Sequence, residues 1–447
     1  MEQARNRIIV VGAGFAGLSA VHHLLRAGVP GERVVLLERA PHVGGRAFSF
    51  VDRESGHVLD NGQHVLLGCC TSFTRLLDER ARHPGVRFQP LLSIPVYADG
   101  GFRTIESRRL PGPLHLVPSL LRYAHVSLDG RLRIAQAAFA MLGAPSRDLD
   151  AQSFRAFLER HGQTDEVIRR VWDLVGTAIL NGHADDISAG LAVESFQIGF
   201  LRGPEPSRLG LFTRPLGDLA EEAAASLRAQ GVEVRRGRAV GIAADDVGVT
   251  SVRLADGSSL EARCVILAVP HDQARALLPD GAIDRAAWLH RARYSPILNV
   301  YLEYPKRVMD LDVAASFAMG GMFVFNRGRL LEDAELDGRL LSISISAADA
   351  YRSWDADVIA RSVEAAVAEM FPAAREVGTS WRKVVWQPKA TFLAEPGLGL
   401  KRPGVRTRLR GLYLAGDWVD TGWPACLEGA VRSGEMAAAA AREDGVS

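Results

Sequence analysis

The residues with the clearest chemical meaning in this chain are three glycines near its start, Gly12, Gly14 and Gly17. They follow the apolar run 8–11, and a later apolar run ends in Glu38. In a strand–turn–helix unit, glycines at this spacing allow a tight turn, let backbone amides approach a pyrophosphate and let the helix pack on the strand. An acid at the end of the next strand accepts hydrogen bonds from ribose hydroxyls. The pattern predicts a dinucleotide site, with contacts also from Phe15, Ala16 and Arg39. The alternative is a structural turn with an incidental acid.

A second glycine motif, Gly44-Gly45-Arg46, comes soon after Glu38. Paired glycines let a loop pass close to cofactor phosphates, and a guanidinium group can neutralise phosphate charge. An arginine on a solvated loop is the alternative, but the position after the ribose acid favours binding. We therefore expect these three residues to contact the same cofactor.

A third motif lies near the other end of the chain, where the apolar run 412–415 leads into Gly416 and Asp417. Asp417 can hold ribityl or pyrophosphate-linked hydroxyls, although a turn acid is the alternative. A helix beginning near Leu427 would direct its N-terminal dipole at the N1–C2 edge of a reduced flavin. FAD, unlike a nicotinamide cofactor, needs such a second site far from its adenosine. We expect one tightly held FAD, an external electron donor or acceptor, and cofactor contacts also from Pro424 and Ala430.

Length and composition set the remaining limits. The 447 residues suit two domains, and 47% apolar with 23% charged residues is ordinary for a globular protein. A net charge of +1 gives no electrostatic case for nucleic acid. The four cysteines have the spacing of neither a disulfide framework nor a zinc site, so we expect no metal and a reducing, cytoplasmic location. No signal peptide and no membrane-spanning run is expected.

Apolar periodicity predicts the elements that position these motifs. Helices are expected at 15–27, 217–230 and 427–442, and a helical block that forms an inserted lid at 111–143, 153–161 and 165–180. Short strands at 232–234, 239–243, 249–254 and 264–269 predict an antiparallel meander that returns to a buried strand. Alternation at 297–304, 322–325, 340–346 and 380–386 predicts a second sheet.

Four stretches of the chain resemble the flavin amine oxidase and phytoene desaturase superfamily: GAGFAGLSA, LLERAPHVGGRAFSF, DNGQHVLLG and LAGDWVDTGWPACLEGAVRSG. Within it, residues 60–64 and 417–424 resemble most the hydroxysqualene dehydroxylase family, FAD-dependent enzymes of bacterial hopanoid pathways. The resemblance spans nearly the whole chain. Related phytoene desaturases often have Tyr-Pro-Gly where this chain has Trp423-Pro424-Ala425.

The resemblance implies an α/β fold: a Rossmann-like FAD-binding domain around a central parallel sheet, and a second substrate domain with a mixed sheet and helices. We expect the FAD domain at 1–67, 205–272 and 405–447, and the substrate domain at 68–204 and 273–404 with its helical lid near 111–180. Val240 falls where relatives hold adenine through backbone groups, and Gln63 and His64 lie in a loop expected to return to the cofactor. The cysteine of the covalent-flavin motif is missing, so the FAD should be noncovalent, and Cys426 is expected to be a small buried residue.

The activity that the resemblance implies is reductive removal of the hydroxyl group of a lipophilic triterpene alcohol. That reaction needs a hydride from reduced flavin, a proton donor and a dry apolar cavity. His64 is the first candidate donor, with a structural histidine as the alternative; Asp60, which could orient it, and Asp420 are further catalytic candidates, and Glu194 is a weaker one. The lid and three tryptophans are candidate cavity walls: Trp172, Trp418 and Trp423.

Three other functions stay open at this point. A carotenoid or phytoene-type desaturase would use the same flavin site with electrons running the other way. An amine oxidase is less favoured, and the intact phosphate glycines oppose a non-catalytic prenyl-lipid carrier.

Residues 111–143 mix apolar side chains with arginines, so this segment is either a lid packed on the protein or a face for peripheral contact with the inner side of the cytoplasmic membrane.

Overall fold

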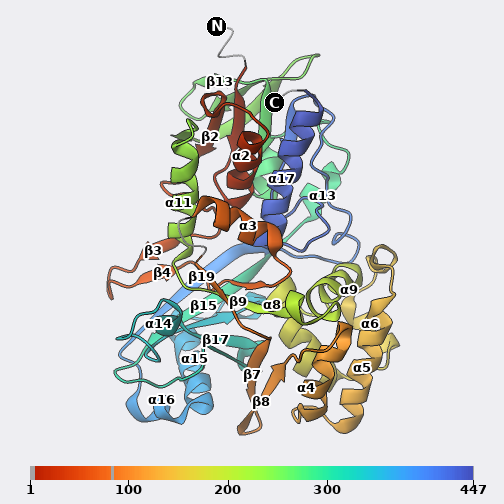
Figure 1. Ribbon diagram of the computed structural model, residues 1–447, viewed down its shortest axis with the longest axis vertical. Helices are drawn as coiled ribbons and strands as arrows, with labels where there is room; N and C mark the ends of the chain where they lie inside the picture. Colours follow the sequence, from red (N-terminus) through yellow and green to blue (C-terminus); the bar gives the residue numbers. More distant parts are fainter. Residues whose placement is uncertain (1–5, 82–84, 446–447) are drawn as a thin grey trace.

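One half of the molecule is built on a five-stranded parallel sheet (Figure 1). The computed structural model describes residues 6–81 and 85–445. The strand order is β10-β2-β1-β14-β20. The strands are β1 (Ile8–Val11), β2 (Val34–Glu38), β10 (Glu233–Arg236), β14 (Cys264–Leu267) and β20 (Leu412–Leu414). The central strands β1 and β14 are buried throughout, which is why they are continuous apolar runs in the sequence.

Helices from both ends and from the middle of the chain cover one face of this sheet. They are α2 (Phe15–Arg26), α3 (Thr71–Arg80), α11 (Leu216–Arg228) and α17 (Leu427–Glu443). A Cβ on Gly434 would lie 2.2 Å from the carbonyl oxygen of Ala16, so α17 and α2 pack at backbone distance. The Ser19 hydroxyl also donates to the Val431 carbonyl at 2.7 Å. The N-terminal and C-terminal glycine motifs therefore belong to one layer.

The other face is covered by the antiparallel strands β11 (Ala239–Ala244), β12 (Val249–Leu254) and β13 (Ser259–Glu261). This meander was predicted, but the assignment of residues 232–234 to it is wrong, because β10 pairs in parallel with β2. An edge strand of a parallel sheet is half solvated, so its sequence lacks the apolar run of a central strand.

The second half contains a seven-stranded mixed sheet in the order β19-β15-β18-β17-β16-β7-β8. The predicted strands are present as β15 (Tyr294–Glu303), β17 (Met322–Asn326), β18 (Leu340–Ile345) and β19 (Trp381–Phe392). Three further strands were missed: β7 (Ser93–Ala98), β8 (Gly101–Glu106) and β16 (Val313–Ser316). Helix α15 (Ala356–Met370) packs on one face, and the other face points towards the first half (Figure 1).

The expected helical block is present beside this sheet (Figure 1). It comprises η2 (Gly112–Leu116), α4 (Val117–Arg122), α5 (Leu128–Leu142), α6 (Phe154–Arg160), α7 (Asp165–Val167), η4 (Ile168–Asp173) and α8 (Leu174–Leu180), followed by α9 (Ala189–Phe196) and η5 (Gln197–Leu201). The predicted domain boundary after residue 67 falls before α3, although α3 packs on α11 and α17 of the first half.

Candidate active site

A cavity of about 800 Å³ runs from the glycine motifs of the first half to the mixed sheet of the second. Its lining comes from chain segments that are hundreds of residues apart. Most of the predicted cofactor residues line it: Gly12, Gly14, Phe15, Ala16, Glu38, Arg39, Gly44, Gly45, Arg46, Gln63, His64, Val240, Gly416, Asp417, Pro424, Leu427 and Ala430. Their contact with a flavin stays a prediction, but the fold brings them to one trough.

The first glycine motif forms a tight turn between β1 and α2. Gly12 has φ +104°, and a Cβ there would lie 2.4 Å from the carbonyl oxygen of Ala268. Gly17, which does not line the cavity, sits against the turn: its Cβ would lie 1.9 Å from the carbonyl oxygen of Gly12. Gly14 caps α2 without a side chain, and the first turn carries no acid, so its amides can receive an anion.

Glu38 stands at the carboxyl end of β2, beside that turn. Its carboxylate accepts hydrogen bonds from the backbone amides of Ala13 and Ala40, each at 2.8 Å. These bonds hold the carboxylate at the cavity, where Arg39 and Val240 of β11 are neighbours in the lining. The arrangement fits an acid that receives ribose hydroxyls.

The second and third motifs meet through an ion pair. The amide of Gly44 donates to the carbonyl of Ala13 at 2.8 Å, which joins the second motif to the first. Arg46 Nη2 donates to Asp417 Oδ1 at 2.5 Å. Burial lowers the pKa of Arg46, but the Asp417 carboxylate outweighs that effect and holds the pKa above its ordinary value. The guanidinium therefore stays charged beside the trough.

The N-terminus of α17 reaches the same trough. Leu427 and Ala430 line the cavity, and the Cys426 thiol accepts the amide hydrogen of Gly429 at 3.4 Å. Glu428 was not predicted as a site residue. Its carboxylate is fully buried and accepts the amide hydrogens of Ser72 and Phe73 at 3.0 and 2.8 Å. It fixes α3 to α17; an acid in the first turn of a predicted helix was the only available signal.

These residues fit FAD, which the fold family implies. The backbone cradle at α2 suits a pyrophosphate, Glu38 suits a ribose, Arg46 supplies positive charge, and the start of α17 lies at the far end of the trough. The trough then opens into space lined by apolar side chains from β16, β17 and α8 and from the neighbouring segments: Leu92, Ile94, Ile105, Val175, Ala178, Ile179, Phe200, Ile297, Val313, Phe323 and Phe325. This second space is called the apolar chamber below.

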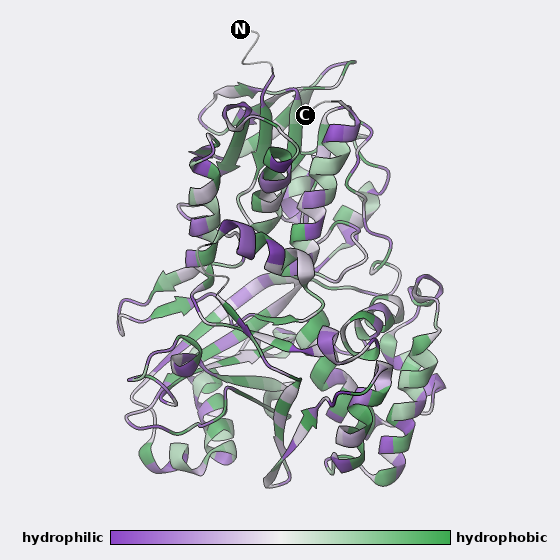
Figure 2. Cartoon of the chain, in the orientation of Figure 1, coloured by the Kyte–Doolittle hydropathy of each residue, from purple (hydrophilic) through white to green (hydrophobic). Residues whose placement is uncertain are grey.

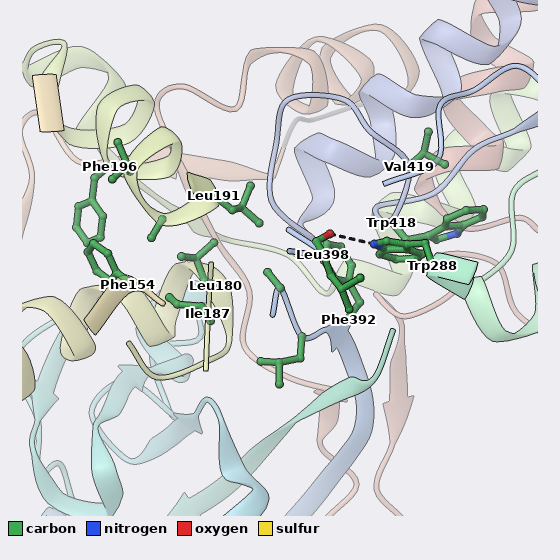
Figure 3. Close-up of a cluster of buried hydrophobic side chains, with 14 of the residues drawn as sticks. Phe154, Leu180, Ile187, Leu191, Phe196, Trp288, Phe392, Leu398, Trp418 and Val419 are labelled. Carbon is green, nitrogen blue, oxygen red and sulfur yellow. Dashed lines mark hydrogen bonds between the residues drawn. The ribbon is translucent and has the colours of Figure 1, made fainter. Parts of the chain in front are cut away.

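Two of the three candidate tryptophan walls lie elsewhere. Trp418 is buried in the core and stacks on Trp288, whose indole donates to the Leu398 carbonyl at 2.9 Å (Figure 3). Trp172 is buried against Phe154 and donates to Gln163. Only Trp423 of the three lines the cavity. Of the predicted lid, α8 contributes to the chamber, whereas α4 and α5 do not.

Asp60 is not placed for catalysis, contrary to the prediction. Its Oδ2 accepts from Arg327 at 2.8 Å, and its Oδ1 accepts from the Ser49 hydroxyl and the Leu216 amide at 2.5 and 3.1 Å. Both members of the ion pair are buried, outside the cavity lining. Asp60 therefore anchors the second half of the molecule to the first.

Asp420 is also outside the cavity. Its carboxylate accepts the Gly422 amide hydrogen at 3.4 Å and lies 3.8 Å from the buried guanidinium of Arg402. Arg402 also donates to the Asp417 carbonyl, so this cluster supports the loop that carries Asp417. Glu194, the weaker candidate, is absent from the residues that line the cavity; burial raises its pKa.

His64 does line the cavity. Its Nδ1 lies 2.9 Å from the Gly62 carbonyl, which assigns the proton to Nδ1 in the neutral ring and leaves Nε2 open. Burial lowers the pKa of the imidazole below its ordinary value. Two neighbours in the lining were not predicted as polar substrate contacts: Gln63 Oε1 and Asn299 Oδ1 are buried and have no hydrogen-bond partner among the described residues.

Comparisons with known proteins agree with this arrangement. The family model described as flavin containing amine oxidoreductase matches residues 15–442. A hydroxysqualene dehydroxylase from Rhodopseudomonas palustris is 30% identical over 443 residues, 96% of each chain. A zeta-carotene desaturase from Synechocystis is 23% identical and covers 97% of this chain and 96% of its own. Among solved structures, putrescine oxidase has a TM-score of 0.72 at 19% identity, covering 98% and 99%. The resemblance and the α/β fold class expected from the sequence are confirmed.

Proposed function

This chain belongs to the family of flavin-containing amine oxidoreductases, and on that premise we propose that it removes the hydroxyl group of hydroxysqualene to give squalene, with noncovalent FAD. That it is a flavin-containing oxidoreductase follows from the family. The substrate and the direction of the reaction are the proposal. Hydroxysqualene dehydroxylases from two bacteria resemble the chain along 96% of its length.

The observation that carries the proposal is the apolar chamber that continues the cofactor trough, in a cavity whose lining also includes two residues with unpaired buried amide oxygens, Gln63 and Asn299. A buried polar atom without a partner costs about 1–3 kcal/mol, so these oxygens favour a ligand that donates a hydrogen bond. Gln63 Nε2 donates to the His64 carbonyl, and Asn299 Nδ2 donates to the Asn61 carbonyl. These bonds fix the orientation of each side-chain amide and leave its oxygen without a partner among the described residues. An alcohol has the matching O–H donor, whereas a carotene hydrocarbon has none.

The reaction converts R–OH, a hydride and a proton into R–H and water. Bound FAD, once reduced by an external two-electron donor, supplies the hydride chemistry. The apolar chamber would hold the hydrocarbon chain and exclude water from the carbon that loses its hydroxyl. Gln63 and Asn299 would orient the hydroxyl, and His64, protonated at Nε2, would give it the proton with which it leaves as water.

The structure also favours noncovalent FAD. Cys69, Cys70 and Cys426 line the cavity, so a thiol is within reach of the trough. Burial raises the pKa of Cys426 to about 12. The hydrogen bond with Cys69, together with burial, raises the pKa of Cys70 well above its ordinary value, whereas the same hydrogen bond lowers the pKa of Cys69. Cys426 and Cys70 are therefore protonated, and protonated thiols are poor nucleophiles. Release of the flavin on acid precipitation would support the noncovalent state, and retention would contradict it.

Product analysis tests the reaction directly. Dithionite-reduced protein, incubated anaerobically with hydroxysqualene, should form squalene in proportion to the flavin oxidised. Asn299→Leu should bind the alcohol more weakly and leave the affinity for squalene unchanged, because only the alcohol uses the amide oxygen. Equal loss for both ligands would contradict the assigned role of Asn299.

A carotenoid desaturase is the second candidate, because the similarity to zeta-carotene desaturases also covers 97–98% of the chain. Oxidised protein that converts phytoene or zeta-carotene, and reduced protein that leaves hydroxysqualene intact, would favour it. A colourless protein without flavin absorbance would favour a lipid carrier.

A further inference from the structure

Helix α5 is apolar on two opposite faces. Its inner face is buried and consists of Gly130, Ile134, Ala137 and Met141. Its outer face consists of Leu128, Leu132, Ala135, Phe139 and Leu142, at spacings of four and three residues that place them on one stripe. Leu128, Leu132 and Phe139 are 72%, 70% and 78% exposed. A surface helix of a globular protein normally keeps its outer face polar, so this stripe requires an explanation.

The neighbouring helix extends the stripe. Val117 and Leu121 of α4 are exposed, and Arg131 of α5 donates to the Leu121 carbonyl at 2.7 Å, which fixes the end of α4 beside the start of α5. Figure 2 shows hydrophobic residues along both helices, at the end of the molecule opposite the parallel sheet. We call these residues the α4–α5 surface: Val117, Leu121, Leu128, Leu132, Phe139 and Leu142.

Positive charge borders this surface. Residues 106–142 carry five arginines and two acids, whereas the whole chain is close to neutral. Arg122 is among the most exposed, with its side chain 73% exposed and 3.9 Å from Glu106. A solvent-facing apolar stripe with a cationic border is the composition of helices that lie in the interface of a bilayer with anionic lipids.

We propose that the α4–α5 surface docks on a lipid bilayer that carries anionic headgroups. Leucine and phenylalanine side chains would enter the acyl boundary while the arginines bind headgroup phosphates. Among the described residues, no helix combines the length and the hydropathy of a membrane span.

The docked surface would lie one layer from the cavity. Gln197 Nε2 donates to the Met141 carbonyl at 2.6 Å, and His115 Nε2 pairs with the Phe200 carbonyl at 2.6 Å. These bonds attach α5 and η2 to η5, whose residues Ile198 and Phe200 line the cavity. A lipid-soluble substrate would then pass from the bilayer to the chamber over a short path. That path rests on the proposed function, whereas the docking surface does not.

Vesicle co-sedimentation of the flavin-loaded full chain tests the docking. The protein should bind vesicles of equimolar phosphatidylcholine and phosphatidylglycerol. Its binding should be weaker to vesicles of phosphatidylcholine alone, and weaker to the mixed vesicles at high salt. Leu132→Ser with Phe139→Ser should lower the partition coefficient roughly 100-fold, about tenfold for each side chain. A matched control is Val51→Ser with Val247→Ser, since these valines are 63% and 73% exposed elsewhere; it should bind as the parent protein does.

Three outcomes would overturn the proposal. The first is a parent protein that stays in the supernatant with every vesicle. The second is a control variant that loses as much binding as the α5 variant. The third is an α5 variant that turns a dimer into a monomer in light scattering and leaves vesicle binding unchanged, which would assign the surface to a second copy of the chain. Thermal melts and flavin content of all variants verify that each is folded.

Discussion

Replacement of Asp60 by asparagine should destabilise the protein and leave its chemistry intact. Asp60 and Arg327 are 2% and 3% exposed, and their charged atoms are 2.8 Å apart. Removal of one partner from such a buried pair costs about 3–5 kcal/mol, because the remaining charge loses its compensation. The asparagine oxygen can still accept from Ser49 and Leu216, so the loss arises at the guanidinium. Urea unfolding, monitored by flavin fluorescence, should show a lower midpoint. Turnover per bound flavin should be retained at acidic pH, and its pH profile should move to lower pH, because the Asp60 carboxylate raises the pKa of His64.

The companion variant isolates the charge. Arg327→Met in the Asp60→Asn background removes the unpaired guanidinium and should restore part of the lost stability, since an apolar side chain is tolerated where an unpaired charge is not. A normal urea midpoint combined with a large loss of turnover at acidic pH in Asp60→Asn would refute this reasoning and return Asp60 to the catalytic group.

Three further predictions concern the cofactor turn and two histidines. Gly17→Ala should abolish flavin binding together with the stability of the first half, because its Cβ would lie 1.9 Å from a backbone oxygen. Gly14→Ala, whose Cβ would make an ordinary 3.7 Å contact, should keep the melting temperature of the flavin-free protein and lower flavin affinity at least roughly tenfold. Equal melting temperatures for the two flavin-free variants would contradict this prediction. If His64 gives the proton, turnover should be greatest at acidic pH and fall as pH rises through a pKa below the ordinary 6.5, and His64→Gln should flatten that profile while flavin stays bound. Burial lowers the pKa of His22 from 6.5 to about 3, so the unfolded chain binds a proton at higher pH than the folded chain does. The stability from this group is therefore complete above pH 6.5 and declines as pH falls towards 3, by at most about 1.4 kcal/mol per pH unit. Urea midpoints measured across that range should decline less steeply in His22→Gln than in the parent protein.

The sequence by itself determined the central strands of the parallel sheet and its glycine motifs. Gly12 and Gly17 are readable because their role is local: each allows a backbone approach within one strand–turn–helix unit, and the spacing records that geometry. The central strands were predicted from continuous apolar runs, because a strand that is buried on both faces is apolar along its whole length. The strands β7 and β8 were missed because partly buried strands with mixed side chains give a weak period-two signal. The strand β16 was missed because it is fully buried and only four residues long, which is too short to show a period.

Only the tertiary structure decided which polar residues face the cavity. Asp60, Gln63 and His64 are close in sequence, yet only Gln63 and His64 reach the cavity lining. Asp60 instead forms a buried ion pair with Arg327, 267 residues further along the chain. Trp418 lies next to Asp417, but its indole donates to the Val269 carbonyl and points into the core. Side-chain partners across such separations depend on how the two halves pack, and no local spacing encodes that contact.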